Sequence, residues 1–181
     1  MSFSFKQAQQ IVRQLEHLNL SEKRKRQYGI LFLLASASGL RCSELFALKL
    51  NDLDFEAKTI RVDESSDQRN KGKVGPCKNV SAYRTVLLYD REGKEALRLL
   101  KNFVKNNDSR HGLIFHSNND TPLIETNVIH DGLHPALKAL GLAQAGLHAF
   151  RHGCNRRWEL AGLNPAVLRQ QMGHSSARMM A

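Results

Sequence analysis

Four short segments of the sequence place cationic or imidazole side chains where they could hold an anionic oxygen. In one of them, His148 and Arg151 lie three residues apart at the start of a predicted helix and so share one face. The guanidinium supplies a fixed charge and a fork of donors, and the imidazole supplies a proton that titrates near neutral pH. In another, His174 follows Gly173 at a helix end, where a glycine turn near a new helix start could bring it to a phosphate.

The other two segments supply an arginine and a lysine. Arg41 comes almost directly after the helix-breaking Gly39, and Glu44, three residues further on, is placed to orient it. Lys78 precedes a predicted strand on a predicted hairpin, where an ammonium group could deliver a proton. Taken one at a time, each pattern is also common on an ordinary solvated surface, for example as an exposed ion pair.

The composition favours a polyanionic partner and argues against a membrane. The chain of 181 residues carries 27 Lys and Arg against 17 Asp and Glu, a net charge of +10, which is typical of nucleic-acid binding. No apolar run approaches the roughly 20 residues of a membrane span, and the N-terminus lacks the apolar core of a signal peptide. We therefore expect a cytoplasmic protein. The three cysteines, Cys42, Cys77 and Cys154, are far apart and predict neither a disulfide framework nor a zinc site.

The apolar periodicity predicts a mainly helical α+β domain. Thr59–Val62 and Arg84–Leu88 are typical of strands, Val74–Cys77 is a candidate third strand, and Leu113–Phe115 is expected to be extended. Short connections favour a small antiparallel sheet, and the order of helices, sheet and helices excludes a parallel α/β sheet. The predicted helices run over about 5–18, from Ser21 to Gly39, through Glu44–Leu48, from Asp90 to Val104, and over about 126–140, 147–161 and 165–172.

Taken in order, the segments SGLRCSEL, a hairpin lysine before YRTVLL, HAFRH and MGHSS resemble the catalytic domain of the tyrosine recombinase (phage integrase) family. The resemblance spans about Phe5 to Ala181 and implies a single catalytic domain with a three-stranded antiparallel sheet packed beside a helical core. It implies site-specific recombination or integration of double-stranded DNA through a 3′-phosphotyrosine, by protomers assembled on the DNA, in a bacterial or phage-encoded protein. It also implies no cofactor and no metal, because guanidinium and imidazole groups neutralise the phosphorane.

The resemblance assigns roles to the arginines and to the lysine. Arg41 and Arg151 match the two arginines that clamp the scissile phosphate. Lys78 matches the hairpin lysine that protonates the leaving 5′-oxygen, with Lys71 and Lys73 as alternatives because the hairpin varies in length.

The resemblance also covers the histidines and the acidic residue. His148 matches the histidine that helps to accept the proton of the nucleophile, and His174 matches the one that donates a hydrogen bond to the phosphate. Glu44 matches an acidic residue that steadies the first arginine. Further candidate phosphate contacts are Arg69, Lys71, Lys73, Arg156 and Arg157.

The nucleophile of the family has no counterpart here. It falls about nine residues after the position matching His174, about two residues beyond Ala181, and Tyr28, Tyr83 and Tyr89 do not match it. We therefore expect this chain to lack the nucleophile, the C-terminal tail and the N-terminal core-binding domain, and to form no covalent intermediate. Charge-driven DNA binding without these parts is expected at a Kd of roughly 10⁻⁴–10⁻⁶ M.

Two other functions compete with this interpretation. A catalytically silent integrase-like module would occupy DNA or a partner recombinase without cutting. A metal-dependent nuclease would use the i,i+4 pairs His130 and His134 or His148 and His152, and it is disfavoured because we expect no suitably placed carboxylate beside them.

Overall fold

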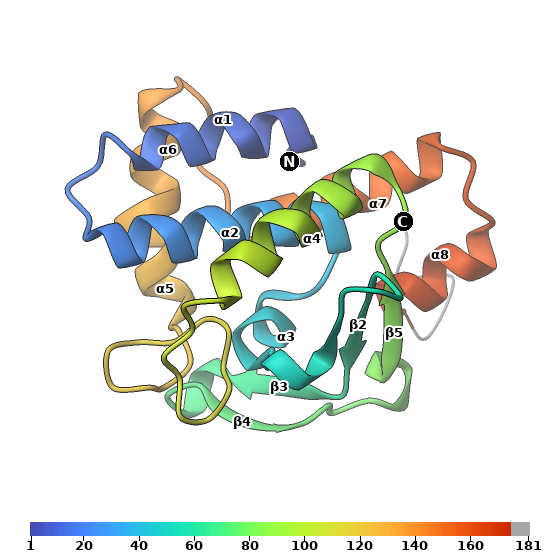
Figure 1. Ribbon diagram of the computed structural model, residues 1–181. Coiled ribbons are helices and arrows are strands. Elements are labelled where there is room, and N and C mark those ends of the chain that lie inside the picture. Colours follow the sequence, from blue (N-terminus) through green and yellow to red (C-terminus); the bar gives the residue numbers. More distant parts are fainter. Residues whose placement is uncertain (175–181) are drawn as a thin grey trace.

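Helix α2 (Glu22–Ser38) forms the centre of the fold in a computed structural model that describes residues 1–174 (Figure 1). It packs against α1 (Phe5–Leu15), α4 (Arg91–Val104) and α7 (His148–Leu160). Its second half is apolar apart from Ser36 and Ser38 and is buried, as expected for a helix with neighbours on every side. The end of α2 is thereby fixed in position relative to α7, which carries candidate site residues.

Local capping chemistry sets the helix boundaries where the sequence predicted them. The Ser21 hydroxyl accepts from the backbone N–H of Arg24 at the start of α2, and Gly39, with a φ of 64°, ends it in the left-handed conformation. Asp90 caps α4 in the same way through Gly93 N. The last helix, α8 (Pro165–Met172), also has its predicted bounds.

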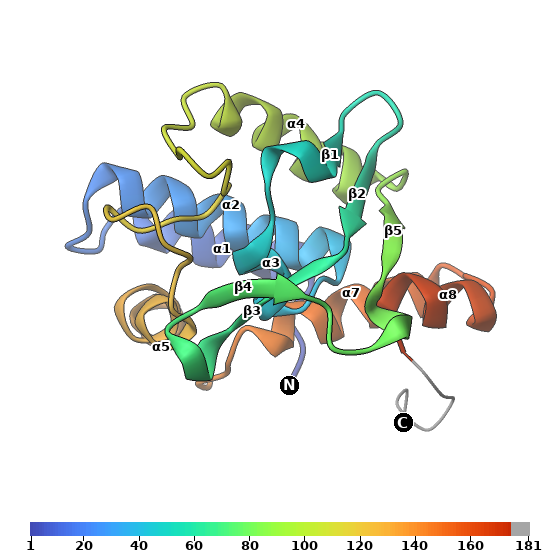
Figure 2. The ribbon, with the colours of Figure 1, turned by 90° about the horizontal axis from the view of Figure 1, so that it is seen from below.

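The strands lie on the side of the molecule away from α1 (Figure 1). A three-stranded antiparallel sheet has the order β1 (Leu53–Asp54), β2 (Thr59–Val62) and β5 (Arg84–Leu87). A separate antiparallel hairpin joins β3 (Glu64–Asp67) to β4 (Lys73–Pro76). Viewed from below, the hairpin lies next to the short helix α3 (Cys42–Ala47), and β5 runs beside α8 (Figure 2).

The candidate third strand is present, but it does not belong to the three-stranded sheet. Val74–Cys77 largely coincides with β4, but Val74 pairs with Ser66 of β3 and not with the three-stranded sheet. The third strand of that sheet is β1, which has only two residues and follows a 3-10 turn. A strand this short contains no alternation of polar and apolar residues, so periodicity cannot detect it.

The remaining helices include one irregular segment. The predicted helix over 126–140 consists of α5 (Glu125–Val128), a π-turn (Ile129–Leu133) and α6 (His134–Ala139). Pro135 has no N–H to donate to the preceding turn, which explains why the helical register widens just before it. The other short helix is α3 (Cys42–Ala47), and Leu113 of the predicted extended piece pairs with Lys49.

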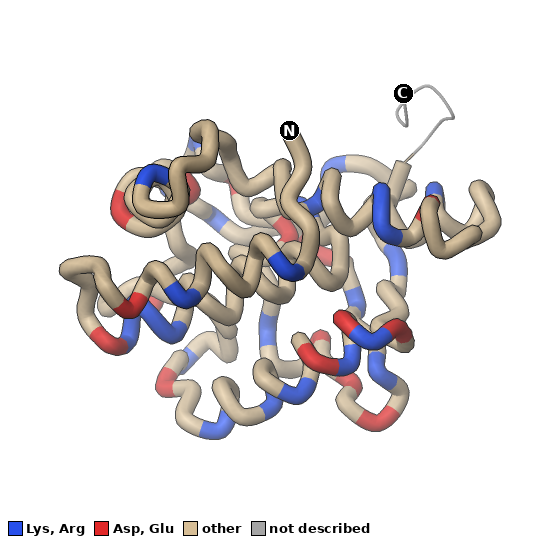
Figure 3. The backbone as a smooth tube through the Cα atoms, turned by 90° about the horizontal axis from the view of Figure 1, so that it is seen from above, with Lys and Arg blue, Asp and Glu red and all other residues tan. Residues whose placement is uncertain are grey.

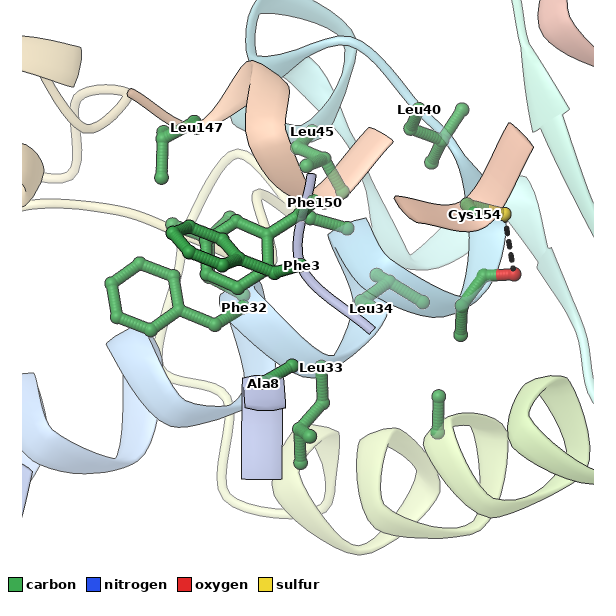
Figure 4. Packing of buried hydrophobic residues seen from close by; sticks show 14 of the residues in the cluster. Phe3, Ala8, Phe32, Leu33, Leu34, Leu40, Leu45, Leu147, Phe150 and Cys154 are labelled. Carbon is green, nitrogen blue, oxygen red and sulfur yellow. Dashed lines mark hydrogen bonds between the residues drawn. The ribbon is translucent and has the colours of Figure 1, made fainter. Parts of the chain in front are cut away.

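Three phenylalanines pack together and join the N-terminus, α2 and α7 (Figure 4). The ring centroids of Phe32 and Phe150 are 5.2 Å apart, and the same distance separates Phe3 from Phe150. Such pairs contribute about 0.5–1.5 kcal/mol each beyond the burial of their area. The N-terminal segment crosses α7 at Gly153, where a Cβ atom would lie 1.7 Å from Phe3 O, so the first half of α7 is firmly held.

Within residues 1–174, none of the helices combines the length and the apolar character that a bilayer crossing requires.

Candidate phosphate-binding site

Arg41 stands between the end of α2 and the start of α3. Its backbone N–H donates to Glu44 Oε2 at 2.8 Å, so Glu44 caps α3 from the third position of that helix. The Nη1 group donates to Glu44 Oε1 and the Nη2 group donates to the carbonyl oxygen of Gly173, both at 2.9 Å. Arg41 is thereby oriented by its own helix and by the end of α8, 132 residues further along the chain.

Glu44 is the shared acceptor of two arginines. It is buried, and besides the two bonds from Arg41 it accepts from Nη1 and Nη2 of Arg84, each at 2.9 Å. These four bonds use the full acceptor capacity of a carboxylate. Burial opposes ionisation of Glu44, but the hydrogen bonds and charge of Arg84, together with Arg41, outweigh it and lower the pKa of Glu44.

Arg151 joins the ends of two helices from its buried position on α7. Its Nη1 group donates to Gly39 O, its Nη2 group donates to Met172 O, and Nη2 lies 3.0 Å from Nε2 of His174. Burial, followed by the charge of Arg41, lowers the pKa of Arg151 to about 10. The guanidinium of Arg151 therefore remains charged at neutral pH. Arg41 and Arg151, the two predicted arginines, both lie at the end of α8.

The contact with Arg151 fixes the protonation of His174. A guanidinium only donates, so Nε2 of His174 accepts and the single proton of a neutral imidazole is on Nδ1. Burial, followed by the charges of Arg151 and Arg41, lowers the pKa of His174, which agrees with a neutral ring. Nδ1 is buried and has no partner in the part of the chain that the structure describes. His174 thus offers one free N–H donor beside two guanidiniums.

Three consecutive carbonyl oxygens at the end of α8 each accept from a different arginine. Gln171 O accepts from Nε of Arg84 at 2.7 Å, while the carbonyls of residues 172 and 173 accept from Arg151 and Arg41. The C-terminal end of a helix carries partial negative charge, so it suits such cations. Gly173 has a φ of 64°, and a Cβ atom there would lie 2.8 Å from Nη1 of Arg84.

Replacing Gly173 by alanine is therefore expected to destabilise the protein by more than the backbone cost alone. Gly141 provides the matched control, because its φ is 65° and a Cβ atom would meet nothing within 4 Å. Gly141→Ala should lower the free energy of unfolding by about 1–2 kcal/mol, and Gly173→Ala should lower it by clearly more, as measured by urea denaturation. Equal losses for the two variants would contradict the close approach of Arg84.

The neutral state of His174 predicts a pH dependence of stability. Its pKa is lower in the folded chain than in the unfolded chain, so the unfolded chain binds the proton first as the pH falls. This contribution is present above about pH 6.5 and is lost as the pH falls through the folded pKa. Urea unfolding at pH 7.5 and 5.5 should show a larger loss for the wild type than for His174→Gln, whose amide oxygen can still accept from Arg151. Parallel losses would disprove the assignment.

The other predicted catalytic residues are near the surface. His148 is the first residue of α7, one turn before Arg151, and it is exposed. Lys78 is exposed in the loop between β4 and β5. Within the described residues, neither side chain forms a hydrogen bond to the arginines, so their catalytic roles stay predictions. Tyr28 is buried, whereas Tyr83 and Tyr89, which flank β5, are about half exposed.

Most of the predicted DNA contacts are exposed, but Arg157 is engaged internally. Its Nη1 group donates to Ser36 O at 2.7 Å, and its Nη2 group donates to Ala37 O and to Asp90 Oδ2 at 3.0 and 2.9 Å. Arg157 therefore joins α2, α4 and α7, and we leave it out of the DNA-facing set. Basic positions are spread over helices and strands (Figure 3), and the exposed candidates are Arg69, Lys71, Lys73 and Arg156.

Neither Arg84 nor the close packing of Gly173 against the arginines was predicted from the sequence. A signal for Arg84 was present, because it shares strand parity with Val86, and both side chains point inward and are buried. A charged residue at an inward position requires a buried partner.

A carboxylate that was not considered above lies between His130 and His134. Asp131 lies 3.5 Å from both Arg24 Nη1 and His130 Nδ1. Among the described residues, no three His, Cys, Asp or Glu side chains form a group suited to a metal ion.

Comparison with known proteins shows the family of this chain. Residues 2–181 match the phage integrase family. The chain is 24% identical over 163 residues to tyrosine recombinase XerC of Bifidobacterium longum (strain DJO10A), covering 90% of this chain and 44% of the relative. It is 27% identical over 170 residues to a XerC-like recombinase of Caldanaerobacter subterraneus subsp. tengcongensis, covering 83% and 43%. The chain thus spans less than half the length of these curated relatives.

Solved structures show the same fold. The Tn1549 transposon integrase in complex with circular intermediate DNA is 22% identical, with a TM-score of 0.76 over 99% of this chain and 60% of that chain. The XerA recombinase is 16% identical, with a TM-score of 0.75 over 99% and 58%. These likenesses confirm the expected helical fold with its small antiparallel sheet. Together with the family match over nearly the whole sequence, they show that the chain belongs to the phage integrase family of tyrosine recombinases.

Proposed function

We propose that this chain contributes the catalytic domain of a site-specific DNA recombinase and that Arg41, Arg151 and His174 hold the scissile phosphodiester. The observation that carries the proposal is the convergence of these three residues at the end of α8. Only two of the five guanidinium N–H groups of Arg41 have partners among residues 1–174, so this residue has donors left for a phosphate. Two guanidinium forks can bind both non-bridging oxygens.

The proposed reaction is a transesterification at phosphorus. A tyrosine hydroxyl attacks the phosphorus and loses its proton, the bond to the 5′-oxygen breaks, and that oxygen gains a proton. Charge accumulates on the non-bridging oxygens, where preoriented donors stabilise it more than in the ground state. Arg41 and Arg151 supply the positive charge that stabilises these oxygens, and Nδ1–H of His174 donates to the same oxygens. In this scheme Lys78 delivers the proton to the 5′-oxygen and His148 assists the nucleophile.

The proposed partner is double-stranded DNA, on which further recombinase protomers assemble. The net charge of +10 supports binding to a polyanion, and the Tn1549 integrase, which has the same fold, was solved with DNA. The exposed basic side chains Arg69, Lys71, Lys73 and Arg156 are the proposed phosphate contacts outside the site.

A nick-sealing assay tests the proposal without any nucleophilic tyrosine in the protein. The substrate is a nicked duplex with a 3′-phosphate esterified to p-nitrophenol next to a 5′-hydroxyl. The 5′-oxygen attacks phosphorus and gives up its proton, the bond to the nitrophenyl oxygen breaks, and yellow nitrophenolate leaves with the electron pair. We expect the wild-type chain to seal the nick and to release one nitrophenolate per nick, with no effect of a chelator.

Other outcomes separate the competing functions. Binding of the duplex by folded protein without sealing would overturn the catalytic proposal and support a silent DNA-binding module. Cleavage that a chelator abolishes would support a metal-dependent nuclease. Lys78→Ala should slow sealing, because the same residue must then take the proton from the attacking 5′-hydroxyl.

A further inference from the structure

Three arginines meet at the end of α8, but their donors are used differently. Four of the five N–H groups of Arg84 have protein acceptors, namely both oxygens of Glu44, Ala82 O and Gln171 O. The side chain of Arg84 is 2% exposed, whereas that of Arg41 is 28% exposed. Arg41 therefore faces a substrate, and Arg84 is enclosed by the protein.

Arg84 connects the strand β5 to the end of α8. The bond from its Nε to Gln171 O is reinforced by the Gln171 side chain, which accepts from Leu87 N at 2.7 Å and donates to Thr85 O at 3.1 Å. The side chain thus satisfies two backbone groups of β5 and fastens α8 to that strand. Since the next two carbonyls of α8 orient Arg151 and Arg41, a shift of α8 would move both.

Arg84 also determines how strongly Glu44 attracts the guanidinium of Arg41, and therefore how far Arg41 is available to a substrate. Glu44 carries one negative charge and pairs with both arginines at 2.9 Å. With Arg84 present, the carboxylate is neutralised from its buried side. Without Arg84, Arg41 would be the only counter-charge of Glu44, and its guanidinium would be drawn toward that carboxylate and away from the open side of the site.

We infer that Arg84 is a positioning residue for phosphoryl transfer, which neutralises Glu44 and fixes the end of α8 so that Arg41 and Arg151 face the phosphodiester. This inference rests on the proposed function. It differs from a role in substrate binding, because four of the five N–H groups of Arg84 are already bonded to protein acceptors. A lysine at this position could not replace the planar pair with both oxygens of Glu44.

The test compares sealing rates per folded molecule for four chains: the wild type, Arg84→Met, Glu44→Gln and the double variant Arg84→Met/Glu44→Gln. We expect Arg84→Met to seal about a hundredfold more slowly, the size of effect produced by a misplacement of about 1 Å. The double variant removes the buried carboxylate charge that would otherwise draw Arg41 away from the substrate, so it should recover to within about tenfold of the wild type. Arg98→Met, an exposed arginine of α4, should leave the rate unchanged.

Each outcome decides one question. No sealing by the wild type would overturn the proposed function. Sealing by the wild type and equally fast sealing by Arg84→Met would overturn the inference. A double variant at least as slow as the single one would also overturn it, because neutralising Glu44 would then not be what Arg84 contributes. If Arg84→Met does not fold, Arg84→Lys and the double variant provide the comparison, with the double variant expected to be faster.

A spectroscopic measurement separates a positioning role of Arg84 from direct contact with the substrate. On addition of orthovanadate to ¹⁵N-labelled protein, the guanidinium signals of Arg41 and Arg151 should shift in the wild type, while those of Arg84 stay in place. A shift of the Arg84 signals as large as those of Arg41 would overturn the inference.

Discussion

Arg151→Lys is expected to slow nick sealing by about 10³–10⁵-fold, by analogy with arginine fingers in phosphoryl transfer. Arg151 donates to Gly39 O and to Met172 O, and a lysine ammonium cannot reproduce a planar fork between two fixed acceptors and a phosphate. Binding of the nicked duplex should change only a few fold, because the positive charge is kept and most of the affinity comes from contacts elsewhere.

The matched control for this prediction is Arg98→Lys, the same substitution at an exposed position of α4. It should seal at the wild-type rate. Thermal unfolding of both variants shows whether the slow one is folded. Sealing by Arg151→Lys within tenfold of the wild type would mean that the phosphate is not held by this guanidinium.

Glu44→Ala is expected to cause the largest loss of stability, about 3–5 kcal/mol, because it leaves a buried guanidinium without its counter-charge. Arg84 loses two hydrogen bonds at 2.9 Å, and the start of α3 loses the cap on the Arg41 N–H. Urea denaturation measures the free energy of unfolding directly. A loss below 1 kcal/mol would show that the four bonds to Glu44 do not persist in solution.

Glu22→Ala is the control for the buried pair. Glu22 pairs with Lys25 at 3.0 Å, but its side chain is 77% exposed, so its loss should cost no more than about 1 kcal/mol. The pH provides a second check on Glu44. Because its pKa is lowered by folding, its contribution is present above about pH 4.5 and is lost as the pH falls through the folded pKa. Glu44→Gln should lack this part of the acid sensitivity.

Interactions between near neighbours could be predicted from sequence. Ser21 and Gly39 bound α2, and Asn164 and Gly173 bound α8, because capping bonds and the left-handed turn involve residues only a few positions apart. The pairing of Arg41 with Glu44 belongs to the same class, since three residues span one helical turn. The motifs around Arg41, Arg151 and His174 are likewise short stretches of sequence, and together they indicated the family.

The pairing of the strands required the tertiary structure. β4 lies where a strand was expected, yet its partner is β3, and the three-stranded sheet is completed by the two-residue β1. Alternation along a strand reports which face is buried but not which strand lies beside it.

By itself, the sequence determined the helices, their caps and the set of cationic groups suited to a phosphate. Only the tertiary structure decided which of those groups bind within the protein. Arg84 points inward and pairs with Glu44, 40 residues away. Arg157, which was predicted to contact DNA, donates to the end of α2. The reason is physical. A guanidinium bonds to the acceptors that lie within about 3 Å of it. The acceptors for these two arginines are carboxylates and backbone carbonyls that only folding brings near.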